Sequence, residues 1–387
     1  MSKIVIIGTG LAGYTLAREF RRRNQDAELV LITRDDGSSY SKPMLSNALS
    51  KDKEADELVM ATLDKMAIDL NAKILNNTHV VNIDAQEKTL EIEHGTNKET
   101  VHYDQLVLAN GANTIKAPIE GNAANSVLSV NDLEDYRQFR NELIKGKRIV
   151  IIGAGFIGCE FANDLSHVDA EVSIVDLAPQ ALGLLVPEEA AAMLKEKLSE
   201  LGVKWHFGNS VTHVENSEDQ SSLLVTLKDG TTIETDIVLS AIGLRPNLTL
   251  ADIASLETER GIKVNRYMQT SDKHIYALGD CAQVEDLTLP FVMPLMASAR
   301  ALAATLAGEE TAVRYPAMPV AVKTPCYPTV VCPSPRRIEG EWDVEINEQG
   351  VCGLFKDSDD NILGFVLMGE RVSEKTALAK QIPDWLP

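Results

Sequence analysis

The sequence predicts an α/β fold built on two Rossmann-like units, with a small α+β region at the C-terminal end. Three observations lead to this prediction. An apolar strand, a glycine-rich turn, a helical pattern and a second apolar strand occur at residues 4–33 and again at residues 149–176, as in a βαβ unit. Eight of 14 positions are identical between residues 4–17 and 149–162. From about residue 315 the chain is rich in β-branched residues and proline, which favours short strands.

In both units the glycines have the Gly-x-Gly-x-x-Gly spacing of a dinucleotide-binding domain. They are Gly8, Gly10 and Gly13 in the first unit, and Gly153, Gly155 and Gly158 in the second. The first glycine makes a tight turn, the second lets the backbone approach a pyrophosphate, and the third allows close helix–strand packing. The next helix begins with unpaired N–H groups, which bind phosphates. The residues between the glycines are expected to flank the phosphates: Leu11, Ala12, Phe156 and Ile157.

The two units differ where their second strand ends. Asp176 ends the second unit, and its carboxylate can bind a ribose diol and repel a 2′-phosphate, which favours NAD over NADP. Aligning the two units places Thr33 opposite Asp176, so the first unit lacks this acid. Asp35 or Asp36, just beyond, is the preferred contact of the adenosine ribose. Alternatively, the Thr33 hydroxyl takes a reduced form of this role.

The pattern of apolar residues predicts further elements along the chain. Helices are expected at residues 51–70, 132–145, 187–201 and 294–308. Alternating strands are expected at residues 73–101, 203–207, 211–214 and 223–227. The last three strands are expected to form a hairpin-rich edge that turns at Asp229 and Gly230.

Composition limits the classes of function. With 387 residues the chain exceeds one typical core, and about two to three domains are expected. The formal net charge of −20 argues against nucleic acids and anionic membranes as partners. No apolar run approaches the ~20 residues that cross a bilayer, and no signal-peptide pattern is present, so we expect a cytoplasmic protein without membrane insertion. The five cysteines form no CxxC motif or metal-ligand cluster, so no metal site is expected.

Three short motifs resemble one protein family. They are SYSKPMLS at residues 39–46, IYALGDCA at residues 275–282 and VKTP at residues 322–325. Together with the two glycine-rich units they resemble the pyridine nucleotide–disulfide oxidoreductase-like flavoproteins, and most of all their rubredoxin reductase branch. The resemblance covers essentially the entire chain. It implies FAD bound in the first unit and NAD(H) in the second.

The resemblance also implies roles for individual residues. Lys42 and Pro43 would lie against the flavin ring, Glu160 near the nicotinamide and Lys323 beside the pyrimidine ring. Lys42, Glu160 and Lys323 are therefore the expected catalytic residues; alternatively, each lysine is solvated and Glu160 is a first-turn acid that satisfies the helix dipole. Asp280 would bind the ribityl chain. Further cofactor contacts are expected at Val81, Gly111, Gly243 and Leu295.

The absence of a redox-active cysteine pair defines the expected chemistry. Members of the family that carry such a pair place it after the first unit or in the nucleotide domain, and this sequence has none there. The resemblance then implies hydride transfer from NADH to FAD and single-electron transfer to rubredoxin, a small iron protein. The alternatives are a ferredoxin reductase of an oxygenase system, an NADH oxidase or, more distantly, an NADH-sensing flavoprotein.

The expected domains are an FAD-binding domain at residues 1–112 and 240–314, an NAD-binding domain at residues 113–239 and a C-terminal domain at residues 315–387 that covers the flavin and meets the acceptor. Rubredoxins are usually acidic, so a chain of net charge −20 needs a basic docking face to bind one. The candidates for this face are Arg300, Arg314, Lys323, Arg336 and Arg337.

Overall fold

A five-stranded parallel sheet forms the centre of the first lobe in the computed structural model, which describes residues 2–334 and 338–387. Its strand order is β20-β9-β1-β2-β5. The strands are β1 (Lys3–Ile7), β2 (Glu28–Ile32), β5 (Lys73–Leu75), β9 (Gln105–Leu108) and β20 (Ile275–Ala277). β1 and β2 are almost wholly apolar because a parallel sheet is covered on both faces.

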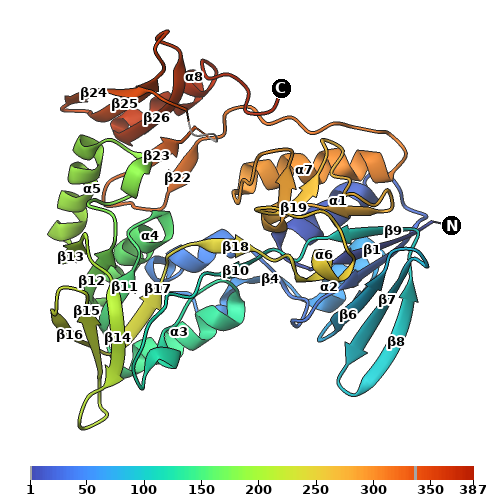
Figure 1. The fold of residues 1–387 in the computed structure, drawn as a ribbon, viewed down its shortest axis with the longest axis horizontal. Helices are drawn as coiled ribbons and strands as arrows, with labels where there is room; N and C mark the ends of the chain where they lie inside the picture. The colour runs from blue at the N-terminus through green and yellow to red at the C-terminus, as the bar shows by residue number, and fades with distance from the viewer. Residues whose placement is uncertain (1, 335–337) are drawn as a thin grey trace.

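Helices cover one face of this sheet and a second sheet covers the other (Figure 1). The helices are α1 (Leu11–Arg21) and α7 (Val292–Leu306). The second sheet is antiparallel and consists of β6 (His79–Asp84), β7 (Thr89–His94) and β8 (Asn97–His102). Smaller elements complete the lobe: α2 (Leu63–Leu70), α6 (Thr249–Ile253), β3 (Ser39–Tyr40), β4 (Val59–Ala61), β19 (Ile262–Val264) and β21 (Ala282–Val284). The strands expected after residue 73 and the helix expected from residue 294 are thus confirmed.

The second lobe repeats the arrangement with a four-stranded parallel sheet of order β13-β12-β11-β17. The strands are β11 (Arg148–Ile152), β12 (Glu171–Asp176), β13 (Lys204–Phe207) and β17 (Ile237–Ser240). Alternate residues of the sheet face opposite ways. Ile149 and Ile151 pack in the cluster that includes the lobe's helices, α3 (Leu133–Lys145), α4 (Phe156–Leu165) and α5 (Glu188–Glu200). Val150 and Ile152 pack against an antiparallel sheet of β14 (Val211–Asn216), β15 (Leu223–Leu227) and β16 (Thr232–Thr235).

One strand prediction in this lobe was wrong. β13 pairs in parallel with β12 and not with the hairpin that follows it. The alternation of residues 203–207 is shared by both kinds of strand, so only the tertiary partner distinguishes them. The hairpin itself consists of β14 and β15, and the Asp229-Gly230 turn joins β15 to β16.

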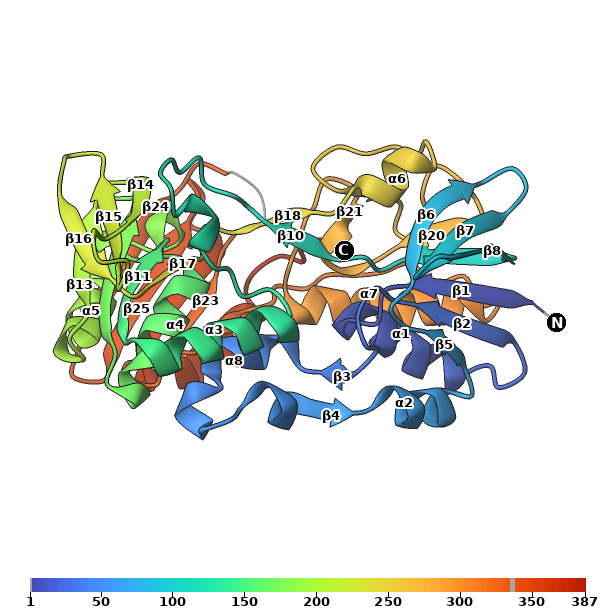
Figure 2. The same cartoon turned by 90° about the horizontal axis from the view of Figure 1, so that it is seen from below.

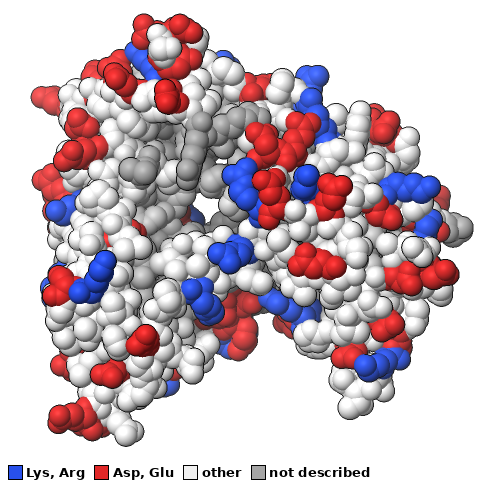
Figure 3. Space-filling model, in the orientation of Figure 1, with Lys and Arg blue, Asp and Glu red and all other residues white. Residues whose placement is uncertain are grey.

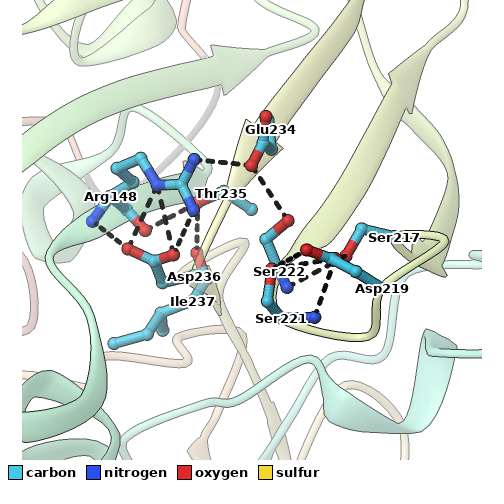
Figure 4. Close-up of polar contacts among 9 residues, drawn as sticks. All are labelled: Arg148, Ser217, Asp219, Ser221, Ser222, Glu234, Thr235, Asp236 and Ile237. Carbon is cyan, nitrogen blue, oxygen red and sulfur yellow. Dashed lines mark hydrogen bonds and ion pairs between the residues drawn. The ribbon is translucent and has the colours of Figure 1, made fainter.

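Arg148, the first residue of β11, ties the parallel sheet to the antiparallel one (Figure 4). Its backbone N–H donates to Asp236 Oδ2 at 2.9 Å and its Nη2 lies 2.5 Å from Asp236 Oδ1. Its Nη1 donates to Glu234 at 2.8 Å. These hydrogen bonds lower the pKa of the Asp236 carboxyl below its ordinary value. The ion pair therefore fixes the point at which β16 leads into β17.

Two antiparallel strands connect the lobes, β10 (Ala112–Thr114) and β18 (Leu244–Pro246), as Figure 2 shows. Each follows the last glycine of a crossover, Gly111 or Gly243, and both glycines have positive φ (65° and 111°). This conformation is favourable for glycine and strained for other residues. β10 and β18 therefore carry the chain from the first lobe to the second and back, side by side.

Residues 42–58 belong to the first lobe by sequence but pack into the core of the second. They form short 3₁₀ helices: η1 (Lys42–Asn47), η2 (Leu49–Lys51) and η3 (Ala55–Leu58). Leu45, Ala48 and Leu49 are buried in the same cluster as Phe139 of α3 and Phe161 of α4. Of the surface helices expected at residues 51–70, α2 is observed as an α-helix, and residues 55–58 form the 3₁₀ helix η3 instead.

The C-terminal sheet is antiparallel, with order β22-β23-β26-β25-β24. Its strands are β22 (Val320–Val322), β23 (Thr329–Cys332), β24 (Glu341–Asn347), β25 (Gly350–Lys356) and β26 (Ile362–Gly369), followed by the 3₁₀ helix η8 (Glu370–Glu374) and α8 (Lys375–Ala379). Successive residues join different clusters: Val331 and Val366 join that of the second lobe, Cys332 and Phe365 that of the first. One face of the sheet is therefore buried in the second lobe's cluster, and the other face belongs to a cluster that includes η8, α8 and the first lobe.

The described residues contain no helix that is both long enough and apolar enough to span a membrane. Within the same ranges, no group of three or more His, Cys, Asp or Glu side chains is arranged to hold a metal ion. The positions Arg336 and Arg337, two of the expected docking residues, lie outside the described ranges.

Candidate functional site

Both glycine-rich turns have the same geometry. Gly8 and Gly153 take positive φ, at 111° and 106°. A Cβ on Gly13 or Gly158 would lie 1.9 Å from the carbonyl oxygen of the first glycine in its turn, so only glycine fits at these positions. A Cβ on Gly10 would meet no atom within 4 Å, and the same holds for Gly155. The middle glycine of each turn thus faces open space at a helix N-terminus, as a dinucleotide pyrophosphate requires.

The residues after the middle glycine begin the helix in each unit. Leu11 and Ala12 are the first residues of α1, and Phe156 and Ile157 are the first residues of α4. Neither helix has a side-chain cap at its N-terminus. The first N–H groups of both helices are therefore available to an anionic ligand.

In the first unit the second strand ends without an acidic residue, and the nearby Asp35 carboxylate lies beside the glycine-rich turn instead. Its Oδ1 accepts hydrogen bonds from the Thr33 hydroxyl at 2.6 Å, from the Gly37 N–H at 3.0 Å and from the Thr9 hydroxyl in the glycine-rich turn at 3.3 Å. Asp36 instead accepts from the N–H and hydroxyl of Ser38. The geometry favours Asp35 over Asp36 as the ribose contact, with Thr33 orienting the Asp35 carboxylate.

In the second unit Asp176 lies at the corresponding place. Its Oδ2 accepts a hydrogen bond from the N–H of Ala154 in the glycine-rich turn, and its Oδ1 accepts one from the Ala178 N–H at 2.6 Å. A carboxylate oxygen has two lone pairs. Each oxygen of Asp176 uses one of them in these hydrogen bonds, so one lone pair on each oxygen is left for a ligand. The carboxylate is therefore fixed beside the turn and can still bind a ribose hydroxyl.

Lys42 and Asp280 come together at the centre of the molecule. Lys42 begins η1 and Asp280 follows the positive-φ Gly279 in the 3₁₀ helix η7 (Gly279–Cys281). The Lys42 Nζ lies 3.9 Å from Asp280 Oδ2 and donates to Asn131 Oδ1 at 2.7 Å. Asn131 in turn donates to the carbonyl of Ala112 at 3.0 Å. Ala112 begins β10, which with β18 forms the connector between the lobes. One amide side chain thus holds Lys42 at the point where the lobes meet.

Glu160 and Lys323 form a buried ion pair across the second lobe and the C-terminal sheet. Glu160 is 3% exposed. Its Oε2 lies 2.5 Å from Lys323 Nζ and accepts from the Ser46 hydroxyl at 2.6 Å. Its Oε1 accepts from the Lys323 backbone N–H at 3.0 Å. Glu160 is therefore more than a first-turn acid that satisfies the helix dipole, and Lys323 is not a freely solvated lysine.

The remaining expected cofactor contacts occupy different settings. Val81 is exposed on β6 at an irregularity where Val80 and Asn82, but not Val81, pair with β7, a place where backbone groups are left for other partners. Leu295 is buried in α7, and its side chain lies 3.7 Å from a Cβ built on Gly279. Pro43 is in the first turn of η1.

Four polar residues at the junction of the lobes were not predicted from the sequence. Ser46 and Asn131 bind the expected catalytic residues Glu160 and Lys42. Asn163 and Asp164 are each 2% exposed. Asn163 Oδ1 accepts from the Cys326 N–H at 3.1 Å, and Asp164 accepts from the N–H groups of two residues in η2. The one signal in the local sequence was an Asn-Asp pair, Asn163 and Asp164, inside an otherwise apolar helix. The partners of these residues could not be predicted from it.

The cysteines do not form a redox pair. All five are free thiols. Burial raises the pKa of Cys281 to about 12 and also raises the pKa of Cys159. Both thiols are therefore protonated at neutral pH and are not nucleophiles.

Each of the two glycine-rich turns has a carboxylate bound beside it, Asp35 in the first unit and Asp176 in the second. Lys42 and Asp280 lie close together where the lobes meet. A sequence profile of the family described as "Pyridine nucleotide-disulphide oxidoreductase" matches residues 2–305. The chain belongs to this family. Membership confirms the predicted α/β class, the oxidoreductase class, and FAD with NAD(H) as cofactors. The residues present fit these cofactors, because each middle glycine faces open space and each ribose carboxylate keeps acceptor capacity.

The C-terminal region matches a second profile, described as "Rubredoxin binding C-terminal domain", over residues 312–382. The chain is 48% identical over 387 residues to the rubredoxin-NAD(+) reductase of Alcanivorax borkumensis, covering 100% of both chains. It is 45% identical over 390 aligned residues to the rubredoxin-NAD(+) reductase of Acinetobacter baylyi, covering 100% of this chain and 99% of that one.

Among solved structures, the chain is similar to the covalent putidaredoxin reductase–putidaredoxin complex. The TM-score is 0.88 and the identity 27%, over 99% of this chain and 94% of the other. That structure holds a reductase covalently joined to putidaredoxin.

Proposed function

We propose that this protein is an NADH:rubredoxin oxidoreductase, which takes a hydride from NADH and passes single electrons to rubredoxin. The observation that carries the proposal is the match of residues 312–382 to a rubredoxin-binding domain. Full-length identities of 48% and 45% to two rubredoxin-NAD(+) reductases support the same acceptor. The absence of a cysteine pair in the chain excludes a protein dithiol as the next carrier.

Flavin, when bound, supplies the conversion of a two-electron hydride donor into single-electron transfers, which nicotinamide alone cannot make. The chain's own part in the reaction is to bind and orient. The α1 and α4 N-termini hold the two pyrophosphates, Asp35 and Asp176 hold the riboses, and Asp280 accepts from a ribityl hydroxyl. This arrangement converts an encounter of two cofactors into a near-attack geometry.

Lys42 and Lys323 supply positive charge at the flavin in this proposal. Lys42 is held by Asn131 and lies near Asp280, and Lys323 is held by Glu160. A cation fixed in advance stabilises negative charge that develops during hydride transfer without further reorganisation. The N-terminus of α7 adds the positive end of a helix dipole on the same lobe.

The acceptor is expected to dock over the connector. Figure 3 shows an opening between the lobes, with several Lys and Arg side chains around the middle of this face and Asp and Glu side chains beside some of them. Lys116, Arg245, Arg300 and Arg314 are exposed basic residues that could contribute to such a face. In a chain of net charge −20, a local basic face is what would steer an acidic iron protein to the flavin.

We also propose a domain division that follows this chemistry: residues 1–112 and 240–314 for FAD, 113–239 for NAD and 315–387 for the acceptor side. A cytoplasmic location is part of the proposal. It is supported by five cysteines that are all free thiols, as expected in a reducing compartment.

Anaerobic stopped-flow absorbance tests the function. The FAD-loaded protein is mixed with NADH and then with oxidised rubredoxin at two ionic strengths. We expect rapid flavin bleaching, followed by rubredoxin reduction that slows as salt is raised. A [2Fe–2S] ferredoxin and oxygen serve as comparison acceptors. Faster electron transfer to either of these than to rubredoxin would refute the proposed acceptor and leave the cofactors in place.

A further inference from the structure

One face of α4 carries three polar side chains that are almost completely buried. Glu160, Asn163 and Asp164 are each 2–3% exposed, although helix residues of these types are rarely fully buried. All three accept hydrogen bonds from segments outside the second lobe's parallel sheet: from Ser46 of η1, from η2, and from residues that precede β23. α4 is thus bonded to both neighbouring parts of the chain.

Asp164 makes the most specific of these contacts. Its Oδ2 accepts from the Leu49 N–H at 2.9 Å and its Oδ1 from the Ser50 N–H at 2.8 Å. These are the first two N–H groups of η2, whose own cap residue, Ala48, makes no side-chain hydrogen bond. A carboxylate from 114 or 115 residues away in sequence therefore performs the task of a helix cap. A charge buried this deeply is costly unless such partners are present.

The two ends of this link carry the two halves of the proposed reaction. α4 begins at the turn of Gly153, Gly155 and Gly158, which is the cradle for NAD(H). η1 and η2 form one continuous stretch of residues 42–51, which begins with Lys42 and Pro43. Apolar contacts alone would hold this stretch less precisely, because they are not directional.

We propose that Asp164 is a positioning residue for hydride transfer: it fixes residues 42–51 to the helix that begins the NAD(H) site, so that the nicotinamide and the flavin side of the junction keep one relative geometry. This inference rests on the proposed function but concerns only the step between NADH and FAD. It does not depend on which protein accepts the electrons.

The test compares Asp164→Asn with Asp169→Asn in the FAD-loaded protein. Asn at position 164 keeps one carbonyl acceptor and places an amide donor against the other N–H. Asp169 is exposed, just beyond the same helix, with φ of 53°, a conformation that Asn tolerates well. The control thus removes one negative charge near the end of the same helix and leaves both hydrogen bonds of Asp164 to η2 in place.

Two measurements are made on each variant. Hydrogen exchange by mass spectrometry, without NADH, should show faster exchange in peptides covering residues 42–53 for Asp164→Asn only. Anaerobic stopped-flow reduction by NADH should show a limiting rate constant lower by ~10- to 100-fold, as expected for a small misplacement of reacting groups. The Kd for NADH should stay within about twofold, because its own contacts are intact.

The inference is overturned if the limiting rate is unchanged, whatever the exchange result, or if the Kd for NADH rises as much as the rate falls. Should Asp164→Asn not fold, Asp164→Ser keeps one acceptor and introduces no opposing amide, and the same criteria apply. A wild-type protein whose flavin is bleached by NADH but which does not reduce rubredoxin would refute the proposed function and leave this test intact.

Discussion

Replacing Lys323 with Met tests the buried ion pair of the C-terminal sheet. Glu160 would then be left as a carboxylate that is 3% exposed, with hydrogen bonds only from Ser46 and a backbone N–H. Breaking a buried pair from one side costs about 3–5 kcal/mol. Because the Lys323 side chain is 26% exposed, water reaches the site, and we expect a loss of about 2–3 kcal/mol.

The expected shift in melting temperature follows from chain length. An unfolding entropy of about 2.1 cal/mol/K per residue gives ~0.8 kcal/mol/K for 387 residues. A loss of about 2–3 kcal/mol therefore lowers the Tm by ~3 °C. The assay is thermal unfolding followed by circular dichroism, with excess FAD in all samples so that cofactor occupancy is the same.

A double-mutant cycle provides the control. Glu160→Gln removes the buried charge and keeps an oxygen for Ser46, so the double variant Glu160→Gln/Lys323→Met should be more stable than Lys323→Met alone, by about 1–2 kcal/mol. If the double variant is no more stable than the single one, the destabilisation does not come from a stranded carboxylate and the reasoning is wrong.

Two further predictions concern the glycine-rich turn of the first unit and the ion pair between Arg148 and Asp236 in the second lobe. Gly13→Ala places a methyl group 1.9 Å from the Gly8 carbonyl oxygen and should abolish FAD binding and lower the Tm, whereas Gly10→Ala should weaken FAD binding at unchanged apoprotein Tm; flavin absorbance and circular dichroism measure both. Asp236→Asn should lose about 1–2 kcal/mol at pH 7. Because Arg148 lowers the pKa of Asp236, this stabilisation exists above the unfolded pKa of about 3.9 and disappears as pH falls through the lower folded pKa. Urea unfolding of both proteins at pH 7 and pH 3 measures this: the variant's deficit in unfolding free energy should be smaller at pH 3, and a deficit as large at pH 3 as at pH 7 would contradict the reasoning.

Local patterns were enough to predict the two βαβ units. The apolar strands, the glycine spacing and the helical periodicity at residues 4–33 and 149–176 are short-range signals, and each corresponds to an observed element. The resemblance of three motifs added the family and its cofactors, which the comparisons confirm. Individual roles of the site residues stay predictions.

Contacts between distant segments were not predictable in the same way. The pairing of Glu160 with Lys323 joins residues 163 apart. The burial of residues 42–58 in the second lobe depends on α3 and α4, which begin at Leu133 and Phe156. The choice between Asp35 and Asp36 depended on which carboxylate Thr9 and Thr33 reach. Each is decided by tertiary packing, which local propensity does not contain.

The alternating burial of the C-terminal sheet limits how this protein can be recombined. A segment cut at residues 312–382, where the rubredoxin-binding profile matches, would leave behind Trp385 and Leu386, which are buried with the first lobe. It would also uncover Val331, which is buried in the cluster of the second lobe. The C-terminal segment therefore cannot be exchanged between reductases on its own to change the acceptor. A chimera must also carry the apolar residues of both lobes that pack against this segment.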